Sequence, residues 1–596
     1  MIMDTKILKN MFACLIVSAG MLSCQRIVPE EVTDLVLSNC LTPVSLSTSF
    51  VGDYDVRFSW LVAKDADCYR LVVADDAEYT SIVRVDTVDA ASVPYTLALA
   101  PGVYYYKVQA MAEDRGGSHW AYGEFTLKMP VCDIPTNPSV KVIDDCKVEF
   151  TWDISRKSEI YDVVISSDPE FADILHSVSV PASQMPYTTT LDNGMYYFKV
   201  RARADGRVDS EWAVYKPGVI IMKTVDLGVN QTANSYVVSA FGKYRFKAVK
   251  GFKDISVGAV AEAELIWETS VEASGNALEV NSVITQTYAD GGYIYFVTPM
   301  SLKEGNALIA AKDAAGKILW SWHIWVVEDD IEDVDLGNGI VLMDRNIGEV
   351  DADGVEYSGM LYQWGRKDPF PGTLSDGRTV SVAGTAISHE GRQLAAVKEN
   401  NVQVTDINTL MANPTVLYGA CSTENEGAKP YFLGSGSLEG IPAGDYDYWG
   451  SAGSGVKTEY DPCPAGYRVP HAFDESFVNG NDLSRTRFSF FSGFLYVGES
   501  FEMTVGNGAS LKFRRSGHIL LNTSIDQYEK AGAAVKGAGN AFFLWTASRN
   551  AKRISGCVRV SDSEGAQFWG KAGDNDAKYQ AKNNAYTIRC EKDKIR

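Results

Sequence analysis

A repeat with a constant offset is the feature that most constrains how this chain folds. VRFSWLVAKDADCYRLVVADDAEY at 56–79 aligns with VEFTWDISRKSEIYDVVISSDPEF at 148–171, and PGVYYYKVQA at 101–110 aligns with NGMYYFKVRA at 193–202. Both alignments have the same offset of 92 residues. Apolar residues alternate with polar ones in short runs divided by Gly, Pro and Asp turns, as in strands with one buried face. The repeat predicts two copies of one small all-β sandwich.

The two copies, at 36–130 and 131–223, resemble the fibronectin type III domains of bacterial secreted proteins. Trp60 and Trp152 take the place of the core tryptophan on the second strand, and the two G-x-Y-Y-x-K-V-like runs resemble the strand that ends in YxVxA. The resemblance implies a spacer or a protein-contact module, because this fold hosts many functions and specifies none.

The N-terminus resembles the export signal of a bacterial lipoprotein. Lys6 and Lys9 precede an apolar run that is too short to span a bilayer, and Met21-Leu22-Ser23-Cys24 resembles a lipobox. The resemblance implies a signal peptide at 1–23, an acylated Cys24 and a tether at 24–35. It also implies an outer-membrane lipoprotein at the surface of a Gram-negative cell, with the membrane as its lipid-mediated partner. An ordinary signal peptide with a chance cysteine is the alternative.

Charge and length narrow the class of protein further. The formal net charge of −21 argues against nucleic acid and against anionic lipid as partners, since both need clusters of Lys and Arg. The length of 596 residues suggests about four domains at roughly 150 residues each. The oligomeric state does not follow from the sequence.

A third β-sandwich is expected at 224–328, and it ends in the tryptophan-rich run ILWSWHIWV at 318–326. Strand alternation puts Trp320 and Trp322 on an apolar face that must be core. His323 and Trp325 share the opposite, mixed face and are the only candidates there for exposed ligand contacts. The acidic run at 329–335 should stay solvated and extended as a linker.

Residues 336–596 contain several distinctive phrases and predict an α+β domain that follows the tandem sandwiches of a mainly β chain. Asp344-Arg345-Asn346, Tyr362-x-Trp364-Gly365, Cys463-Pro464-x-Gly466-Tyr467-Arg468-x-Pro470, Trp545-Thr546-x-Ser548 and Ile588-Arg589-Cys590 resemble the FISUMP-type (major paralogous) domain. That family is related to the C-type-lectin-like fold. Tyr467 stands where the family usually has Trp, and an irregular insertion near 373–456 interrupts the pattern.

The candidate ligand contacts lie in loops of this last domain, because long loops often carry binding. They are Tyr446, Tyr448 and Trp449 in DYDYWG, and Trp569, Asp574 and Asp576 further on. The alternative is that these aromatic residues anchor the loops on the domain. The calcium-binding triplets of sugar-binding C-type lectins do not occur, and we expect no metal and no cofactor.

Cysteine spacing leaves the disulfides open. In the first copy, Cys40 and Cys68 are a candidate pair, with buried free thiols as the alternative. A pair between Cys463 and Cys590 would tie the CPAGYR turn to the last strand. The C-terminal cysteines allow three full pairings, and the sequence does not choose among them; the other two are Cys421 and Cys557.

The chain has no nucleophile, nucleotide-binding or metalloprotease motif, so we expect no enzyme. The sequence predicts a non-catalytic, lipid-anchored surface protein whose β-sandwich stalk presents a lectin-like domain to an extracellular glycan or protein, as in adhesion. A structural or assembly subunit of a surface appendage is one alternative. An enzyme built on the lectin-like domain is a second.

Overall fold

The computed structural model describes the first three β-rich regions almost continuously and the C-terminal region in part. The described residues are 39–270, 278–337, 339–350, 359–372, 381–384, 407–416, 448–450, 457–472, 487–489, 495–497, 500–504, 508, 510–514, 516–519, 535–538, 541–549, 555–561, 563, 565–569 and 584–594.

Module 1 (39–130) and module 2 (131–223) are β-sandwiches of a three-stranded and a four-stranded antiparallel sheet. Their sheet orders are β1-β2-β5 with β4-β3-β6-β7, and β12-β9-β8 with β11-β10-β13-β14. The strands of module 1 are β1 (Val44–Phe50), β2 (Asp55–Leu61), β3 (Cys68–Ala74), β4 (Ile82–Asp89), β5 (Tyr95–Ala98), β6 (Gly102–Met111) and β7 (Ala121–Leu127). Those of module 2 are β8 (Thr136–Val142), β9 (Lys147–Asp153), β10 (Ile160–Ser166), β11 (Ile174–Pro181), β12 (Tyr187–Thr190), β13 (Gly194–Arg203) and β14 (Ala213–Ile221).

The sequence repeat is preserved in the packing of both modules. Trp60 packs edge-on against Tyr69 with ring centroids 5.2 Å apart, and Trp152 packs against Tyr161 at 5.3 Å. Each tryptophan lies between the two sheets, in the place expected for it. The strand order is that of fibronectin type III domains, so the prediction of tandem sandwiches of this type is confirmed. Cys40 and Cys68 do not pair.

Residues 224–326 form most of a third sandwich, which has a four-stranded and a five-stranded sheet. Each sheet contains one parallel pair of strands among antiparallel ones. One has the order β15-β17-β22-β21, and the other has the order β16-β24-β23-β20-β29. Phe246 and Trp322 meet between the sheets with ring centroids 5.1 Å apart. The strands are β15 (Thr224–Asp226), β16 (Ser235–Val238), β17 (Lys243–Lys247), β18 (Val249–Lys250), β19 (Ile255–Ser256), β20 (Glu262–Ser270), β21 (Gln286–Asp290), β22 (Tyr293–Val297), β23 (Gly305–Lys312) and β24 (Ile318–Val326).

The described parts of the C-terminal region are short strands and one helix, α1 (Ile407–Ala412), which lies against β24. The chain is thus mainly β, as expected. Four further sheets have the orders β25-β26-β40-β30, β28-β27-β39-β34-β35, β31-β32-β33 and β36-β37-β38. The strands are β25 (Asp333–Asp335), β26 (Val341–Met343), β27 (Met360–Gln363), β28 (Phe370–Pro371), β29 (Ser381–Gly384), β30 (Tyr467–Arg468), β31 (Leu495–Val497), β32 (Ser500–Thr504), β33 (Ser510–Arg514), β34 (Ser516–Ile519), β35 (Val535–Ala538), β36 (Ala541–Arg549), β37 (Ser555–Ser561), β38 (Gly565–Trp569), β39 (Ala585–Tyr586) and β40 (Glu591–Lys592).

One cluster of buried side chains spans the boundary expected between the third sandwich and the C-terminal region, and a second cluster, from Val334 to Val560, lies on the C-terminal side of that boundary. A single cluster of contacting buried side chains runs from Ala233 to Cys590. Strand β29, from the expected insertion, pairs with β20 and extends the sheet of the third sandwich. We call residues 224–594 the head.

The acidic run 329–335 is also not a free linker. Its last three residues form β25, which pairs with β26, and Val334 points into the core with 7% of its surface exposed. The Tyr467 hydroxyl donates to the Asp333 carboxylate at 2.7 Å, and Lys592 forms an ion pair with the same group. Because the charges find partners on β30 and β40, the run is held in a sheet.

Both faces of β24 are buried, which corrects the expectation that His323 and Trp325 are exposed. Trp325 is 0% exposed, and its indole N–H donates to the carbonyl of Glu349 at 3.1 Å. His323 is 1% exposed, and its ring joins the Asn306 amide oxygen at 2.8 Å and the Ser235 hydroxyl at 3.0 Å. Residues from beyond the acidic run cover this face, so its polar side chains make buried hydrogen bonds.

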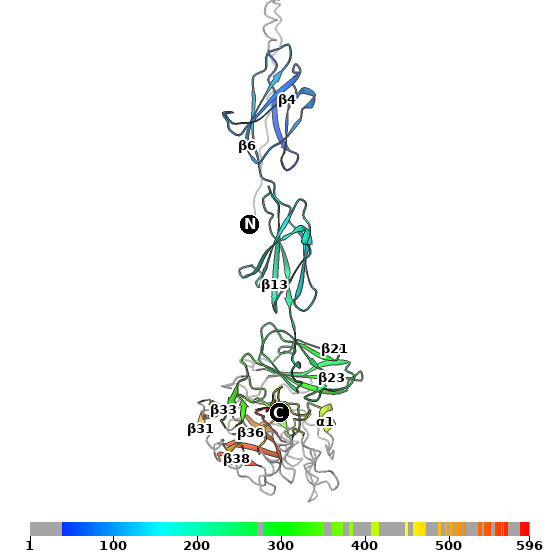
Figure 1. Ribbon diagram of the computed structural model, residues 1–596, viewed down its shortest axis with the longest axis vertical. Helices are drawn as coiled ribbons and strands as arrows, with labels where there is room; N and C mark the ends of the chain where they lie inside the picture. The colour runs from blue at the N-terminus through cyan, green and yellow to red at the C-terminus, as the bar shows by residue number, and fades with distance from the viewer. Residues whose placement is uncertain are drawn as a thin grey trace, which may run out of the picture.

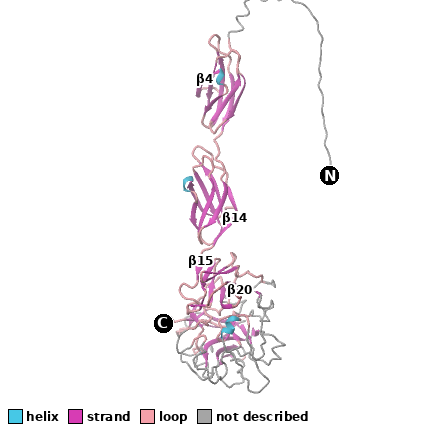
Figure 2. Cartoon of the chain, turned by 90° about the vertical axis from the view of Figure 1, so that its right-hand side faces the viewer, coloured by secondary structure: helices cyan, strands magenta, loops and turns pink. Residues whose placement is uncertain are grey.

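The molecule is a rod that ends in a globular head (Figures 1 and 2). Modules 1 and 2 follow one another along the long axis, and the strands of the third sandwich, including β21 and β23, lie in the part of the head nearest to module 2 (Figure 1). Within the described part of the chain, no helix is both long and apolar enough to cross a membrane.

Candidate functional site

The two described aromatic residues of DYDYWG lie in the core, which corrects their expected role as ligand contacts. Trp449 is 0% exposed, packs against Trp364 at 5.6 Å and donates its indole N–H to the carbonyl of Arg366 at 3.1 Å. Tyr448 is 9% exposed and packs edge-on against Tyr460 at 5.5 Å. They anchor the loop, the alternative left open by the sequence. Tyr446, Asp574, Asp576, Cys24 and the side chain of Trp569 lie outside the described residues.

The distinctive C-terminal phrases meet inside the head as parts of one framework. The indole N–H of Trp364 donates to the carbonyl of Thr546 at 3.0 Å, while that of Trp545 donates to the carbonyl of Tyr362 at 2.6 Å. Each tryptophan therefore bonds to the strand that carries the other. These residues hold two distant segments together, and burial removes them from any ligand.

Arg589, just before strand β40, connects the end of the chain to the Asp344-Arg345-Asn346 segment. Its guanidinium donates to the Asn346 side-chain oxygen at 2.8 Å and to the carbonyls of Asp344 and Lys512, each at 2.7 Å. Burial lowers the pKa of Arg589 to about 10, with Glu349 and Asp344 opposing the shift. The side chain therefore stays charged at neutral pH, paired as a buried cation must be.

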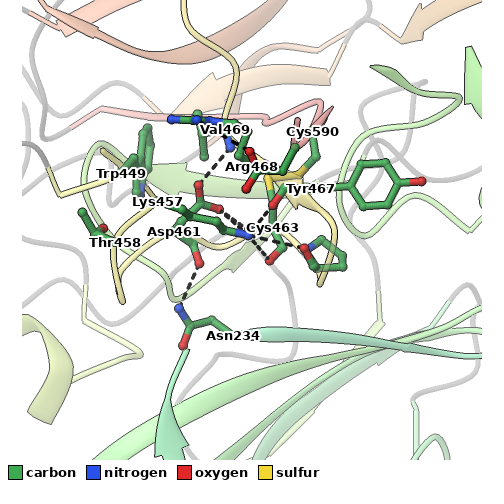
Figure 3. Close-up of polar contacts among 12 residues, drawn as sticks. Asn234, Trp449, Lys457, Thr458, Asp461, Cys463, Tyr467, Arg468, Val469 and Cys590 are labelled. Atoms are coloured by element: carbon green, nitrogen blue, oxygen red, sulfur yellow. Dashed lines mark hydrogen bonds and ion pairs between the residues drawn. A yellow bond between two sulfur atoms is a disulfide. The ribbon is translucent and has the colours of Figure 1, made fainter. Parts of the chain in front are cut away.

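A buried lysine and aspartate organise the turn around Cys463 (Figure 3). Lys457 donates to the carbonyls of Cys463 at 3.3 Å and Pro464 at 3.4 Å, and to that of Tyr467. The Asp461 carboxylate lies 3.5 Å from the ammonium and accepts the backbone N–H of Cys463 at 2.8 Å and of Val469 at 3.0 Å. Burial lowers the pKa of Lys457 to about 8, and burial raises that of Asp461 despite the nearby ammonium.

Cys463 and Cys590 form a disulfide, between the two cysteines that the sequence singled out for the turn and the last strand (Figure 3). Their Cα atoms are 6.0 Å apart, within the usual range for such a bond. Cys557 is buried, and burial raises the pKa of its thiol. Cys421 lies outside the described residues.

Asn234 connects this turn to the third sandwich (Figure 3). Its amide N–H groups donate to the carbonyls of Glu459 at 2.7 Å and Asp461 at 2.9 Å, while its oxygen accepts the indole N–H of Trp320 at 3.0 Å. Lys367 reaches the same sheet and donates to the Ser321 hydroxyl at 2.7 Å. The polar network in Figure 3 therefore joins two halves of the head through buried side chains.

A surface better suited to a ligand lies on the outer face of the sheet β15-β17-β22-β21. Side chains alternate along β17 and β22, so Tyr244, Phe246, Ile294 and Phe296 are buried while the residues between them face outward. The register sets Arg245, Tyr295 and Tyr288 side by side. We call the outward side chains of this sheet the tyrosine face; they are Lys243, Arg245, Lys247, Tyr288, Asp290, Tyr293 and Tyr295.

The tyrosine face combines parallel rings with cations. Tyr288 and Tyr295 stack with centroids 4.7 Å apart and an interplanar angle of 3°. The Arg245 guanidinium lies 4.4 Å from the centre of the Tyr293 ring and is held by Asp226 at 3.1 Å. All three rings are half-buried. Each is fixed in orientation and still partly open to solvent.

A recess of about 510 Å³ lies at the end of this face, between the β21–β22 turn and the β18–β19 hairpin. Its lining includes Tyr293, Lys247, Asp290 and Ser256 together with the backbone of Gly291 and Gly292. The size falls in the range of small-ligand sites, and the lining offers one aromatic ring among donors and acceptors. The sequence signal was the pair KYRFK and GYIYF, whose outward residues are Lys, Arg and Tyr.

The described residues contain no group of three or more His, Cys, Asp or Glu side chains placed to hold a metal ion. Within those residues, the buried Lys–Asp and Arg clusters all have structural partners. The described part of the head exposes aromatic rings, cationic side chains and carboxylates, which are groups that can bind a ligand.

Comparisons with known proteins return structural neighbours only. No protein-family model and no curated protein matches the chain. A two-domain fibronectin type III segment of chicken tenascin matches at 18% identity, over 30% of this chain and 98% of its own, with a TM-score of 0.21. The FN1–FN3 domains of chicken CNTN1 match at 18% identity over 31% and 69%, with a TM-score of 0.15. A structure named FN3tt mut matches at 17% identity over 15% and 96%, with a TM-score of 0.13. The fold of modules 1 and 2 rests on their own strand order.

Proposed function

We propose that the protein is a non-catalytic, lipid-anchored surface protein in which modules 1 and 2 act as a stalk for a ligand-binding head. The ligand is an extracellular glycan or protein. The observation that carries the proposal is the tyrosine face with its recess, which stands on a rigid sheet and is distinct from the buried network of the head. Partly exposed tyrosines and arginine suit binding, because they offer rigid contact area and hydrogen bonds at low entropic cost.

The lectin-like assignment of the C-terminal region belongs to the same proposal. It is supported by the way in which the family phrases lock into a single framework through Trp364, Trp545 and Arg589. Loops that leave such a framework are suited to ligand contact. Tyr446, Trp569, Asp574 and Asp576 remain proposed contacts, whereas Tyr448 and Trp449 do not.

The anchor is proposed from the lipobox-like run that ends at Cys24, with the outer membrane of a Gram-negative cell as its partner. Cys24→Ala should move the protein from the membrane fraction to the soluble fraction, and loss of acyl-chain labelling should accompany the move. Continued membrane retention of the variant would contradict the anchor.

The binding test uses the whole ectodomain, residues 24–596, on glycan and mucin arrays and against extracellular matrix proteins. The double variant Tyr288→Ala/Tyr293→Ala should lose most of the retained binding. Tyr122→Ala, which removes a tyrosine that is 63% exposed on module 1, is the matched control and should bind like the unchanged protein. Loss of binding in Tyr122→Ala alone would place the ligand on the stalk. If the unchanged ectodomain bound nothing on the arrays, the proposal would be refuted.

An assembly subunit is a second candidate, which is favoured by exposed apolar side chains on an edge strand. Strand β4 is at the edge of its sheet, and Ile82, Val83 and Val85 on it are 55%, 43% and 45% exposed. Such edges can pair with a strand of another chain. Oligomers that grow with ectodomain concentration and disappear in Val83→Lys/Val85→Lys would support this candidate, and a monomer at all concentrations would exclude it.

A further inference from the structure

Equivalent aspartates of the repeat occupy the two joints of the rod. Asp53 lies in the turn between β1 and β2 of module 1, and Asp145 lies at the same place between β8 and β9 of module 2, at the offset of 92 residues. Each turn is at the end of its module that meets the next domain. The two carboxylates therefore occupy the same position relative to the domain that comes next along the rod.

At the first joint, Asp53 binds two cations of module 2. Its carboxylate forms ion pairs with Arg207, whose side chain is 10% exposed, and with Lys157. Arg207 also donates to the carbonyl of Val131 at 3.3 Å. The neighbouring Tyr54 hydroxyl donates to the carbonyl of Gly206, a residue with φ of +72° in the same loop as Arg207. The guanidinium thus connects the end of module 1, the entry to module 2 and its β13–β14 loop.

At the second joint, Asp145 repeats the arrangement against the head. It pairs with Lys243 at 2.6 Å and accepts the backbone N–H of Thr224 at 3.0 Å. Asn193 adds a second bridge, because its oxygen accepts the N–H of Lys223 at 2.6 Å and its amide donates to the carbonyl of Phe241 at 3.2 Å. Both joints thus combine an aspartate clamp with a neutral hydrogen bond beside it.

The N-terminal end of module 1 has an arginine equivalent to Arg207, which binds Asp53 at the first joint, but it has no lysine equivalent to Lys157. Arg115 is equivalent to Arg207, whereas Asp65 stands where module 2 has Lys157. Asp65 lies 3.7 Å from Arg115 and accepts the N–H of Leu41 at 3.2 Å. Among the described residues, the arginine at this end is therefore engaged within its own module, with Asp65 and Asp114.

We infer that these aspartates are the docking groups that hold modules 1 and 2 and the head as one stiff rod. Single exposed ion pairs stabilise little, about 0 to 1 kcal/mol. Here each aspartate has two partners, and hydrogen bonds between uncharged groups lie beside it. The contacts at each joint therefore form a network. The stiffness sets how far the head stands from the N-terminal end of the rod, a property separate from what the head binds.

Small-angle X-ray scattering of the ectodomain tests the inference. Asp53→Asn and Asp145→Asn should each lower the radius of gyration and broaden the distance distribution, with a bent population that grows roughly five- to tenfold, as expected for a loss of about 1 to 1.4 kcal/mol. Asp65→Asn makes the same chemical change at the N-terminal end of module 1, away from both joints. This variant should scatter like the unchanged protein.

Two further measurements separate a loosened joint from a damaged module. Thermal unfolding of each variant should match the unchanged protein, since the substituted turns face the joints. The exchange Asp145→Lys/Lys243→Asp should restore part of the extended distribution that Asp145→Asn loses. Unchanged scattering in both asparagine variants would overturn the inference, as would a broad distribution in the unchanged protein.

Discussion

Lys457 places a charge inside a core, and Asp461 supplies the larger share of the negative charge opposite it, with Asp593 adding a smaller one. The ammonium donates to three carbonyls of the turn, while Asp461 supplies the negative charge and accepts two backbone N–H groups. Removing one member of such a pair leaves an uncompensated buried charge, which is far costlier than losing an exposed ion pair.

Asp461→Ala should therefore lower the free energy of unfolding of the head by about 3 to 5 kcal/mol. Denaturant or thermal unfolding measures the loss. Arg84→Ala, which breaks the pair of Arg84 with Asp86 on module 1 from its exposed side, should change stability much less. An equal effect of the two substitutions would mean that the Lys457 pair carries no special weight.

His323 predicts an acid-sensitive head. Burial lowers its pKa to about 3, whereas an unfolded histidine titrates near 6.5. The unfolded state therefore binds a proton that the folded state refuses. This contribution to stability is complete above about pH 6.5 and is lost as the pH falls from there toward 3, with an upper limit on the order of 5 kcal/mol.

Unfolding free energies of the unchanged protein and of His323→Gln, measured from pH 7.5 to 4.5, test this. The variant lacks the titration, so the stability difference between the two proteins should shrink as the pH falls below 6.5. His176→Gln, at an exposed position of β11, controls for the loss of a histidine side chain as such. A constant difference for His323→Gln would show that the folded head takes up a proton at His323 as readily as the unfolded chain does.

Among the elements, the turn at 457–468 is joined by a disulfide to Cys590, the residue directly before strand β40. The Cys463–Cys590 bond spans 127 residues of sequence, and closing a loop of that length is worth about 5 kcal/mol in the chain-entropy model. The double variant Cys463→Ser/Cys590→Ser, or mild reductant, should lower the melting temperature of the head in calorimetry. The melting of modules 1 and 2 should stay unchanged, and a shift in their transition would contradict the assignment.

The elements also differ in how well the sequence predicts them. Modules 1 and 2 follow from the sequence because strict alternation and turns recur at one offset, as with Trp60 and Trp152. Strand β24 was predicted correctly as a strand, but Ser321, His323 and Trp325 find their partners far along the chain or beyond the acidic run. A polar residue on a strand gives the same local signal whether it meets water or a buried partner. Trp449 was misplaced because an aromatic residue in a loop gives the same local signal whether it contacts a ligand or packs on a distant residue such as Trp364.

For the whole molecule, the shared core predicts that residues 224–594 unfold as one unit. A core that runs from Ala233 to Cys590, with β29 in the sheet of the third sandwich, joins the C-terminal region to that sandwich, while a second cluster from Val334 to Val560 lies beyond the sandwich. Expression of 336–596 alone should give a species without a cooperative transition, whereas 224–596 should melt sharply. A cooperative transition for 336–596 would refute the prediction.

The position of β40 has a consequence for the order in which the protein is made. This strand lies between β26 and β30, so its sheet stays open until residue 592 has been synthesised. Modules 1 and 2 contain all of their own strands and can fold while the rest of the chain is still emerging. Strand β24 can pair with β16 and β23 as soon as it is made, whereas the sheet of β25, β26, β40 and β30 depends on the last residues of the head to close. Synthesis of this protein therefore completes modules 1 and 2 first and the head last, and a truncation near the C-terminus should leave the open sheet of the head prone to aggregation.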